Sequence, residues 1–530
     1  MIAIAAVFAI LNLDITTVNV ALVTLGKDLH ADLEDLQWGL NSYMLAFAAL
    51  IVAAGRVADV FGRRRCLLAG AIVFAIASLL CGIAPTLSVL VIGRVLQGAG
   101  GALMLPAGMA IISSVYNAEE RAAALGTLVG IAGVAQSIGP LVGGFLTAQV
   151  SWRLVFWINL PLIAVIMIIA LRGIETRSLP SSLAATTAAL PSMSLSPNAP
   201  FARPPDEIIT HRIDIAGVVV LGTALTSFLV GLDLLQGSDR NPPLALGLIV
   251  LSLALLVVFV IIERRTTNAI VDGKLLQIPA FFCSCVASCF LGFVFFLFLF
   301  MVAVYLQEEF GYSALTAGIG LVPFSLVLAV TGVMSGRLTS RFQMPTLLIV
   351  ACASMALGLA ILSFVPVSYG YSGMVIPFLL IAAGAGPGFT LLNTVGLAAV
   401  SPERFGQATG MIYMFRFGGG AIGVAAASEL HGAFFQRHLA FRLSETPLSF
   451  AQQKLLEQPG AAERIGNIDA GLITSQVELV RQAFHESFAA AFTGTLRLNL
   501  IWPIAIAILV AITLRSKETK TGTGKLMVES

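Results

Sequence analysis

Residues 55–65 read GRVADVFGRRR, a short polar turn that carries one carboxylate, Asp59, among four arginines. An apolar run lies on each side of this turn, and each run has the roughly 20 residues that a helix needs to cross the hydrocarbon core of a bilayer. Consecutive arginines directly beside such a run are typical of the cytoplasmic side of a membrane protein. The stretch therefore predicts two membrane-spanning helices joined by a cytoplasmic turn.

The composition of the whole chain agrees with this interpretation. Of 530 residues, 58% are hydrophobic and 11% are charged, and the mean hydropathy is +0.95, whereas soluble domains carry about 25% charged residues. Apolar runs of spanning length recur about fourteen times along the chain. We therefore expect an all-α membrane protein. The net charge of +2 is too small to indicate a nucleic-acid partner.

Basic residues crowd every second predicted loop. The other short loops contain only Lys27, Arg153 and Arg240, which predicts a multi-pass protein of the inner or plasma membrane with both termini in the cytoplasm. The apolar run after Met1 has no cleavage-site pattern and predicts a membrane helix, not a signal peptide. No basic stretch precedes it, which suggests the hypothesis that the natural start lies further upstream.

The order of the apolar runs divides the chain into two halves. Residues 55–59 (GRVAD) are echoed by residues 336–340 (GRLTS), and parallel repeats with a substrate path between them are a transporter design. The expected divisions are an N-terminal six-helix half (1–172), a Ser-, Ala- and Pro-rich cytoplasmic linker (173–212), two inserted helices (213–265), a C-terminal six-helix half (266–515) with a long external loop at about 436–490, and a cytoplasmic tail (516–530).

Asp14 is the first charge that lies where a charge is costly. At a rise of 1.5 Å per residue it sits near the bilayer centre, where a carboxylate costs about 2.5 to 3.5 kcal/mol unless it faces water or a partner. Desolvation favours the neutral acid, so protonation near neutral pH becomes accessible, as proton coupling requires. The alternative is a structural hydrogen bond to Thr16, Thr17 or Asn19.

Two arginines are similarly deep. Arg94 lies about 12 Å into the fourth predicted helix, with Gln97 on the same face one turn further on, and Arg416 lies deep in the thirteenth. Because arginine stays charged, each could tune a carboxylate or pair with an anion. The alternative is an interhelical hydrogen-bond anchor. Their positions in opposite halves suit groups that line a central cavity.

The fifth predicted helix carries a stripe of small residues with a proline, which includes Gly126, Gly139, Pro140, Gly143 and Gly144. Small residues at this spacing let two helices approach closely, and proline kinks the helix. By itself the stripe predicts tight packing.

The turn at residues 55–65 has its own functional hypothesis. Glycines at its bends, Gly55 and Gly62, and a carboxylate that could pair with Arg63 or Arg64 suit a latch that forms when the cytoplasmic face is closed. The alternative is that the basic residues only orient the protein.

Five motifs together resemble the major facilitator superfamily. Residues 55–65 resemble its loop motif, residues 90–102 its helix-four motif, and residues 126–144 its helix-five antiporter motif. Residues 13–22 and 152–161 are similar to marks of the fourteen-helix drug:proton antiporter branch. The resemblance implies two six-helix halves with two inserted central helices.

The resemblance also implies roles. Asp59 and its arginines would govern the inward–outward transition, Arg94 would assist proton movement, and Asp14 would be a protonation or cation-contact site. The sequence departs from the family pattern at Val60, Ala135 and Val23, which loosens any statement about substrate but not about export.

The sequence therefore predicts a proton-coupled exporter of lipophilic or cationic drugs that works by alternating access as a monomer. A periplasmic adaptor is an open alternative that no feature of the sequence supports. One alternative is a carrier of the same fold for a defined metabolite, such as an amino acid, a siderophore or a sugar product. A membrane enzyme or receptor is the remote alternative, because no cluster of histidines and carboxylates occurs within the spans. Neither a cofactor nor a metal is expected, since no phosphate-binding loop occurs and the cysteines have no ligand spacing.

Overall fold

The computed structural model describes residues 1–31, 33–115, 118–173, 215–236, 241–265, 273–339, 341–365, 369–400, 404–446, 448, 452–453 and 474–522. Within these residues the structure is helical and contains no strand. The predicted linker, residues 173–212, lies almost wholly outside the described residues. The helices are α1 (Ile2–Leu29), α2 (Leu33–Phe61), α3 (Arg63–Gly82), α4 (Leu87–Val115), α5 (Ala118–Gln149), α6 (Leu154–Trp157), α7 (Asn159–Gly173), α9 (Ile215–Gln236), α10 (Pro242–Arg265), α11 (Gly273–Leu276), α12 (Pro279–Glu308), α13 (Ala314–Leu338), α14 (Met344–Leu362), α15 (Gly370–Ala398), α16 (Phe405–Ser444), α19 (Thr474–Asn499) and α20 (Ile501–Gly522).

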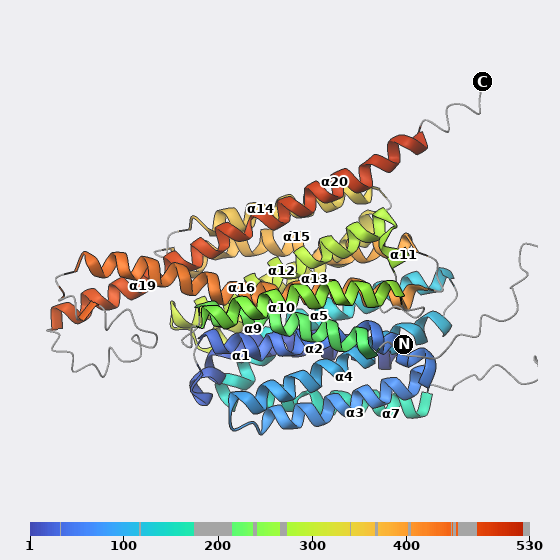
Figure 1. Ribbon diagram of the computed structural model, residues 1–530, viewed down its shortest axis with the longest axis horizontal. Helices are drawn as coiled ribbons and strands as arrows, with labels where there is room; N and C mark the ends of the chain where they lie inside the picture. Colours follow the sequence, from blue (N-terminus) through green and yellow to red (C-terminus); the bar gives the residue numbers. More distant parts are fainter. Residues whose placement is uncertain are drawn as a thin grey trace, which may run out of the picture.

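The long helices run side by side as one bundle (Figure 1). By length and composition, twelve helical segments among the described residues could cross a bilayer. Helices α5 and α9 are not among the twelve, and both run through residues whose side chains are not described. The all-α membrane fold is thus confirmed, whereas the number of fourteen spans stays a prediction.

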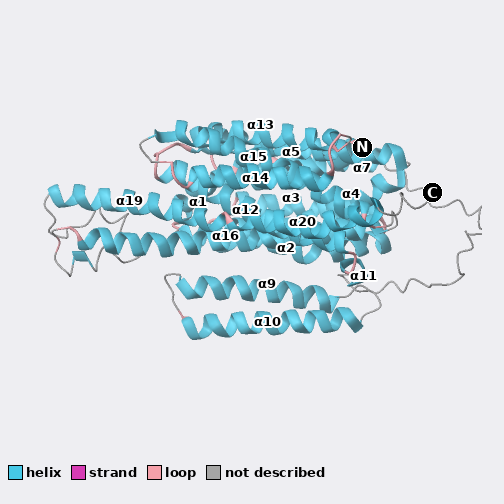
Figure 2. Cartoon of the chain, turned by 90° about the horizontal axis from the view of Figure 1, so that it is seen from above, coloured by secondary structure: helices cyan, strands magenta, loops and turns pink. Residues whose placement is uncertain are grey.

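The bundle consists of an N-terminal half (α1–α7) and a C-terminal half (α12–α20). Contacts between the halves are most extensive where α5 packs on α13 and α2 packs on α16, and α1 also contacts α12 and α13. Between the halves in sequence, α9 and α10 pack on each other, and α9 alone contacts α2 and α16. Figure 2 shows this hairpin beside the bundle. Most side chains of α10 are apolar and exposed, as expected where lipid is the neighbour.

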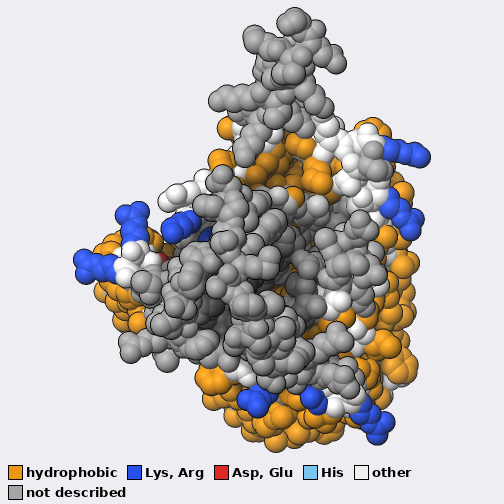
Figure 3. Space-filling model, turned by 90° about the vertical axis from the view of Figure 1, so that its right-hand side faces the viewer, with side chains coloured by type: hydrophobic (Ala, Val, Ile, Leu, Met, Phe, Trp, Pro, Cys, Tyr) orange, Lys and Arg blue, Asp and Glu red, His pale blue; other side chains and the backbone are white. Residues whose placement is uncertain are grey.

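We call the end of the bundle where α1 begins and α20 ends the terminal end, and the opposite end the projecting end (Figure 1). Lysine and arginine side chains surround the rim of the terminal end, around an otherwise apolar body (Figure 3). This is the distribution that the positive-inside rule associates with a cytoplasmic face.

At the projecting end, α16 and α19 extend beyond the other helices (Figure 1). Helix α16 has 40 residues, a length of about 60 Å. Residues 436–444 and 474–490, at the two ends of the segment predicted as an external loop, are helical. The reason is that apolar residues at helical spacing pair the two extensions through a small core of Leu439, Leu443, Val480 and Ala483.

Candidate functional site

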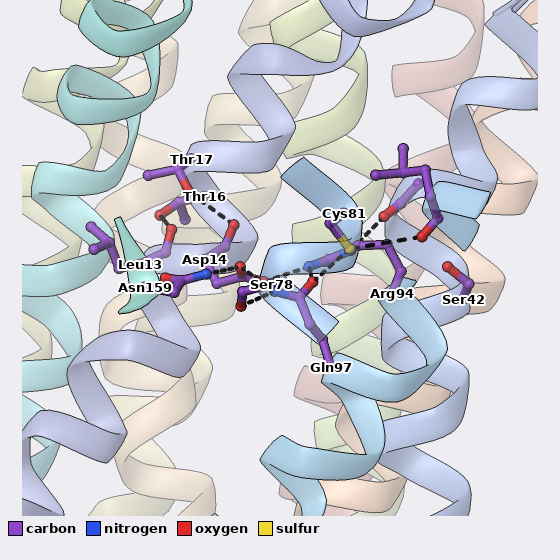
Figure 4. Close-up of polar contacts among 12 residues, drawn as sticks. Leu13, Asp14, Thr16, Thr17, Ser42, Ser78, Cys81, Arg94, Gln97 and Asn159 are labelled. Carbon is purple, nitrogen blue, oxygen red and sulfur yellow. Dashed lines mark hydrogen bonds and ion pairs between the residues drawn. The ribbon is translucent and has the colours of Figure 1, made fainter. Parts of the chain in front are cut away.

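A buried ion pair joins α1 to α4 inside the N-terminal half. Arg94 donates from NH1 to Oδ2 of Asp14 at 2.5 Å, and both side chains are 0% exposed. Figure 4 shows the two side chains pointing toward one another. Two residues 80 positions apart, each placed deep in a helix by sequence alone, therefore meet.

Neutral polar groups also bond to the pair, although the second terminal nitrogen of the Arg94 guanidinium is buried without a partner. Asn159, at the start of α7, donates to Oδ1 of Asp14 at 2.7 Å, and Gln97 approaches the same oxygen at 3.4 Å. Arg94 also donates to the carbonyl of Gly39 at 2.9 Å and to Oε1 of Gln97 at 2.8 Å. The carboxylate and the guanidinium are therefore bonded both to each other and to α2, α4 and α7.

The surroundings of this network include α3, α2 and α6. Gln97 donates to Ser78 at 2.8 Å, and the Cys81 thiol lies 3.5 Å from Oε1 of Gln97. The ring of Tyr43 lies 4.5 Å from the Arg94 guanidinium and that of Phe156 lies 5.9 Å away. Every helix of the N-terminal half except α5 thus contributes to the site.

This arrangement links the charge on Asp14 to the packing of the half. Removing one partner of a buried pair destabilises a protein by about 3 to 5 kcal/mol, because the other charge is left uncompensated. Protonation of Asp14 would leave Arg94 with neutral acceptors only. The packing of the N-terminal half around this pair therefore depends on the charge of Asp14.

The structure brings Asp14, Arg94 and Gln97 together, as their depth in the helices suggested. Asp14 does not use the partners proposed for the structural alternative. Thr17 donates to the Asp14 backbone carbonyl, and Asn19 donates to the carbonyl of Leu299. Sequence reasoning did not assign Asn159 or Ser78. The signal for Asn159 was available, since it is a polar residue within the motif at residues 152–161.

Arg416 lies apart from this network, in the C-terminal half. The rings of Phe389 and Tyr413 lie 4.8 and 4.9 Å from its guanidinium. Its NH2 group lies 3.3 Å from Oδ1 of Asn393 and 3.5 Å from the carbonyl of Phe389. Arg416 is 7% exposed, whereas Arg94 is 0% exposed.

The predicted latch is only partly described. Gly62 separates α2 from α3 with a φ of 95°, a conformation that glycine adopts at no steric cost. Arg63 donates to the carbonyl of Ala110 at 2.7 Å, and Arg64 donates to that of Leu171 at 2.8 Å. These bonds tie the start of α3 to α4 and α7. Asp59 belongs to the last turn of α2, but its side chain is outside the described part, so the latch stays a prediction.

The glycine stripe of α5 contacts both halves. A Cβ built on Gly143 would lie 2.7 Å from the Thr17 backbone of α1, and Gly139 is packed against Thr16 of the same helix. On α13, Gly318 is packed against the carbonyl of Pro140, and a Cβ on Gly144 would lie 2.9 Å from the Cα of Leu315. Backbones approach so closely here because no side chain intervenes. Gly126 lies in α5, but its surroundings are not described.

Helices α1 and α12 are bonded to each other toward the projecting end. Besides the Asn19 bond, Gln307 donates to the carbonyl of Val20 at 3.1 Å. Lys27 pairs with Glu308 at 3.1 Å, with both side chains largely exposed. In this conformation the two halves are therefore closed against each other at the projecting end along this seam.

One titratable contact links the end of α12 to α19. Burial raises the pKa of the Glu309 carboxyl, and its interaction with His485, at 3.4 Å, opposes that shift. The Glu309 side chain is 7% exposed. This contact attaches the long extension at the projecting end to the bundle.

Comparison with known proteins gives many relatives in one group. The Multidrug resistance protein Stp of Mycobacterium tuberculosis is 27% identical over 84% of this chain and 78% of its own length. The Tetracenomycin C resistance and export protein of Streptomyces glaucescens is 27% identical over 93% of this chain and 88% of its own. The Puromycin resistance protein pur8 of Streptomyces alboniger is 30% identical over 83% of both chains.

Solved structures with the same fold include a bacterial homolog of the human lysosomal transporter Spinster, with a TM-score of 0.59 and 16% identity over 97% of both chains. The xylose transporter XylE from E. coli has a TM-score of 0.53 and 12% identity over 81% of this chain and 90% of its own. The family and the fold indicate a multi-pass membrane transporter, not an enzyme. Residues 2–424 match the model of the Major Facilitator Superfamily, and the chain belongs to this family.

Proposed function

We propose that this transporter exports lipophilic or cationic drugs in exchange for protons by alternating access. The observation that carries the proposal is the fully buried Asp14–Arg94 pair, in a chain whose relatives are named for resistance to drugs and antibiotics. A buried carboxylate that cannot change its charge without opening its contacts is suited to couple a proton to a conformational change.

We further propose that the protein lies in the inner or plasma membrane as a monomer, with both termini in the cytoplasm. The basic rim of the terminal end supports this orientation. Export would then move substrate from the terminal end toward the projecting end, against the entry of protons.

The test is uptake into everted membrane vesicles, where export moves substrate into the lumen, with an imposed proton gradient and two lipophilic dyes, one cationic and one anionic. Asp14→Asn removes the charge without changing the size of the side chain, and Arg94→Ala removes the partner. Asp28→Asn is the matched control, because it makes the same exchange at the end of the same helix, where Asp28 is 48% exposed.

Gradient-driven movement of either dye that Asp14→Asn and Arg94→Ala abolish, and that Asp28→Asn preserves, supports the proposal. Transport that survives Asp14→Asn would give that residue a structural role. If a well-folded native protein moves neither dye, the alternative of a dedicated metabolite exporter takes its place. The pair would then be tested with amino acids and sugars.

A further inference from the structure

Arg416 is a buried cation that no carboxylate among the described residues contacts. It has no ion pair with any carboxylate among the described residues, in contrast to Arg94, which is bonded to Asp14. Its polar contacts are the Asn393 amide oxygen and the Phe389 carbonyl, and the ring of Tyr413 lies 4.9 Å from its guanidinium. All three partners are neutral, and its Nε is buried without a partner. Since an arginine cannot release its proton in a protein, its charge persists in this state.

Aromatic rings connect Arg416 to both halves of the bundle. Tyr413 stacks on Phe417, and Phe417 in turn contacts Phe47 of α2, with ring centroids 4.5 Å apart. On the other side Phe389 contacts Phe295 of α12 at 4.9 Å. The guanidinium therefore lies within an aromatic cluster that reaches from the C-terminal half to the N-terminal half.

We infer that Arg416 binds the acidic group of lipophilic substrates, a carboxylate or an ionised phenol, while the aromatic rings around it contact the apolar body. This inference rests on the proposed function and narrows its substrate class. An anion would supply the counter-charge that the described residues do not provide here, and the planar guanidinium offers two parallel donors to a carboxylate. The same charge would disfavour a cation in this position.

The experiment compares a fluorescent lipophilic carboxylic acid with its methyl ester, first by binding to the purified full-length protein in detergent. The native chain should bind the acid about tenfold more tightly than the ester, the size expected for a charge-assisted hydrogen bond. Equal affinity for the two probes would overturn the inference without any variant.

Variants then locate the site. Arg416→Gln should lose the preference for the acid and keep an affinity for the ester near the native value. Arg416→Lys should retain part of the preference for the acid. The matched control is Arg497→Gln, because Arg497 also lies over a ring, that of Phe364 at 4.9 Å, and donates to a carbonyl. Acid binding that Arg416→Gln leaves intact would also overturn the inference.

The binding measurement separates this inference from the proposed function. Probes that bind in the expected order but are not moved by a proton gradient would retain the anion site and reject proton-coupled export. Dye efflux that depends on Asp14, with no preference for the acid in binding, would support proton-coupled export and reject the anion site.

Discussion

At the scale of single residues, Asn159 illustrates how a neutral side chain supports a buried charge. It provides the 2.7 Å hydrogen bond to Oδ1 of Asp14, and the other contact to that oxygen, from Gln97, is longer at 3.4 Å. A hydrogen bond to a charged group contributes about 1.5 to 3 kcal/mol. Asn159 is therefore expected to position the carboxylate toward Arg94.

We predict that Asn159→Ala lowers the melting temperature and reduces efflux about tenfold. Asn159→Asp should lower both quantities further, because it places a second carboxylate against Asp14. Thermal unfolding in detergent and vesicle efflux measure the two effects. If the alanine and aspartate variants are equally impaired, the side chain does not act through its contact with Asp14.

The sequence predicted the charged members of this site and not the neutral ones. Asp14 and Arg94 stood out because a charge deep in an apolar run is costly. Asn159 and Ser78 carry no such penalty and occur commonly in membrane helices as hydrogen-bonding groups. Only the arrangement of α3, α4 and α7 around α1 shows which of them face the pair.

At the scale of helices, α5 is a shared surface between the halves. Gly143 is packed on α1 and Gly144 on α13. We predict that Gly144→Val abolishes efflux while the protein still inserts, since a side chain at this position forces the α13 backbone away. Gly247→Val is the control, because a Cβ at Gly247 in α10 meets no atom within 4 Å. Limited proteolysis would report the altered conformation, and native transport by Gly144→Val would contradict the packing.

The contact between α12 and α19 gives a pH dependence with a definite sign. Because burial raises the pKa of Glu309 above the ordinary value of 4.5, the folded protein holds this proton more tightly than the unfolded chain. The stabilisation of the folded protein by this proton is complete below pH 4.5 and is lost as the pH rises through the raised pKa of Glu309. The contact with His485 opposes the rise in the pKa of Glu309.

We therefore predict that Glu309→Gln gains stability relative to the native protein as the pH increases from 5 to 8. Melting temperatures in detergent across this range measure it. Glu308→Gln is the control, because Glu308 is the adjacent residue in the chain and its side chain is 41% exposed. A constant difference between Glu309→Gln and native protein at all pH values would contradict the prediction.

At the scale of the whole molecule, alternating access requires the seam between α1 and α12 to open at the projecting end. Lys27 and Glu308 lie across it, 3.1 Å apart. We predict that Lys27→Cys with Glu308→Cys, joined by a bifunctional thiol reagent that bridges the two cysteines through reducible bonds, stops efflux, and that reduction restores activity.

The control is a cross-link at the same end that stays within one half. The side chains of Asp28 on α1 and Arg153 beside α6 are paired at 2.8 Å, so Asp28→Cys with Arg153→Cys should accept the same reagent without a loss of transport. The native cysteines are buried or half-buried, which limits unwanted reaction. Full activity of the protein cross-linked between positions 27 and 308 would show that this seam does not open.

The sequence was sufficient for the overall architecture and insufficient at the projecting end. Membrane helices are predictable because hydrocarbon requires long, uninterrupted apolar runs. Outside the bilayer that requirement ends, so residues 436–490 were expected to form a loop, and the pairing of α16 with α19 depends on a few apolar contacts. The hydrogen bonds of Arg63 and Arg64 to distant backbone carbonyls could not be predicted from the sequence either, because every residue has a carbonyl.

The extensions of α16 and α19 also have a practical consequence. A transporter inside a detergent micelle offers an electron microscope little contrast, because protein and detergent merge into one smooth outline. Two paired helices that extend beyond the micelle interrupt this smooth outline, so they help to determine the orientation of each particle image. Imaging of this protein could therefore begin without an antibody fragment as a marker, and the same helices would offer an antibody its epitope if one were wanted.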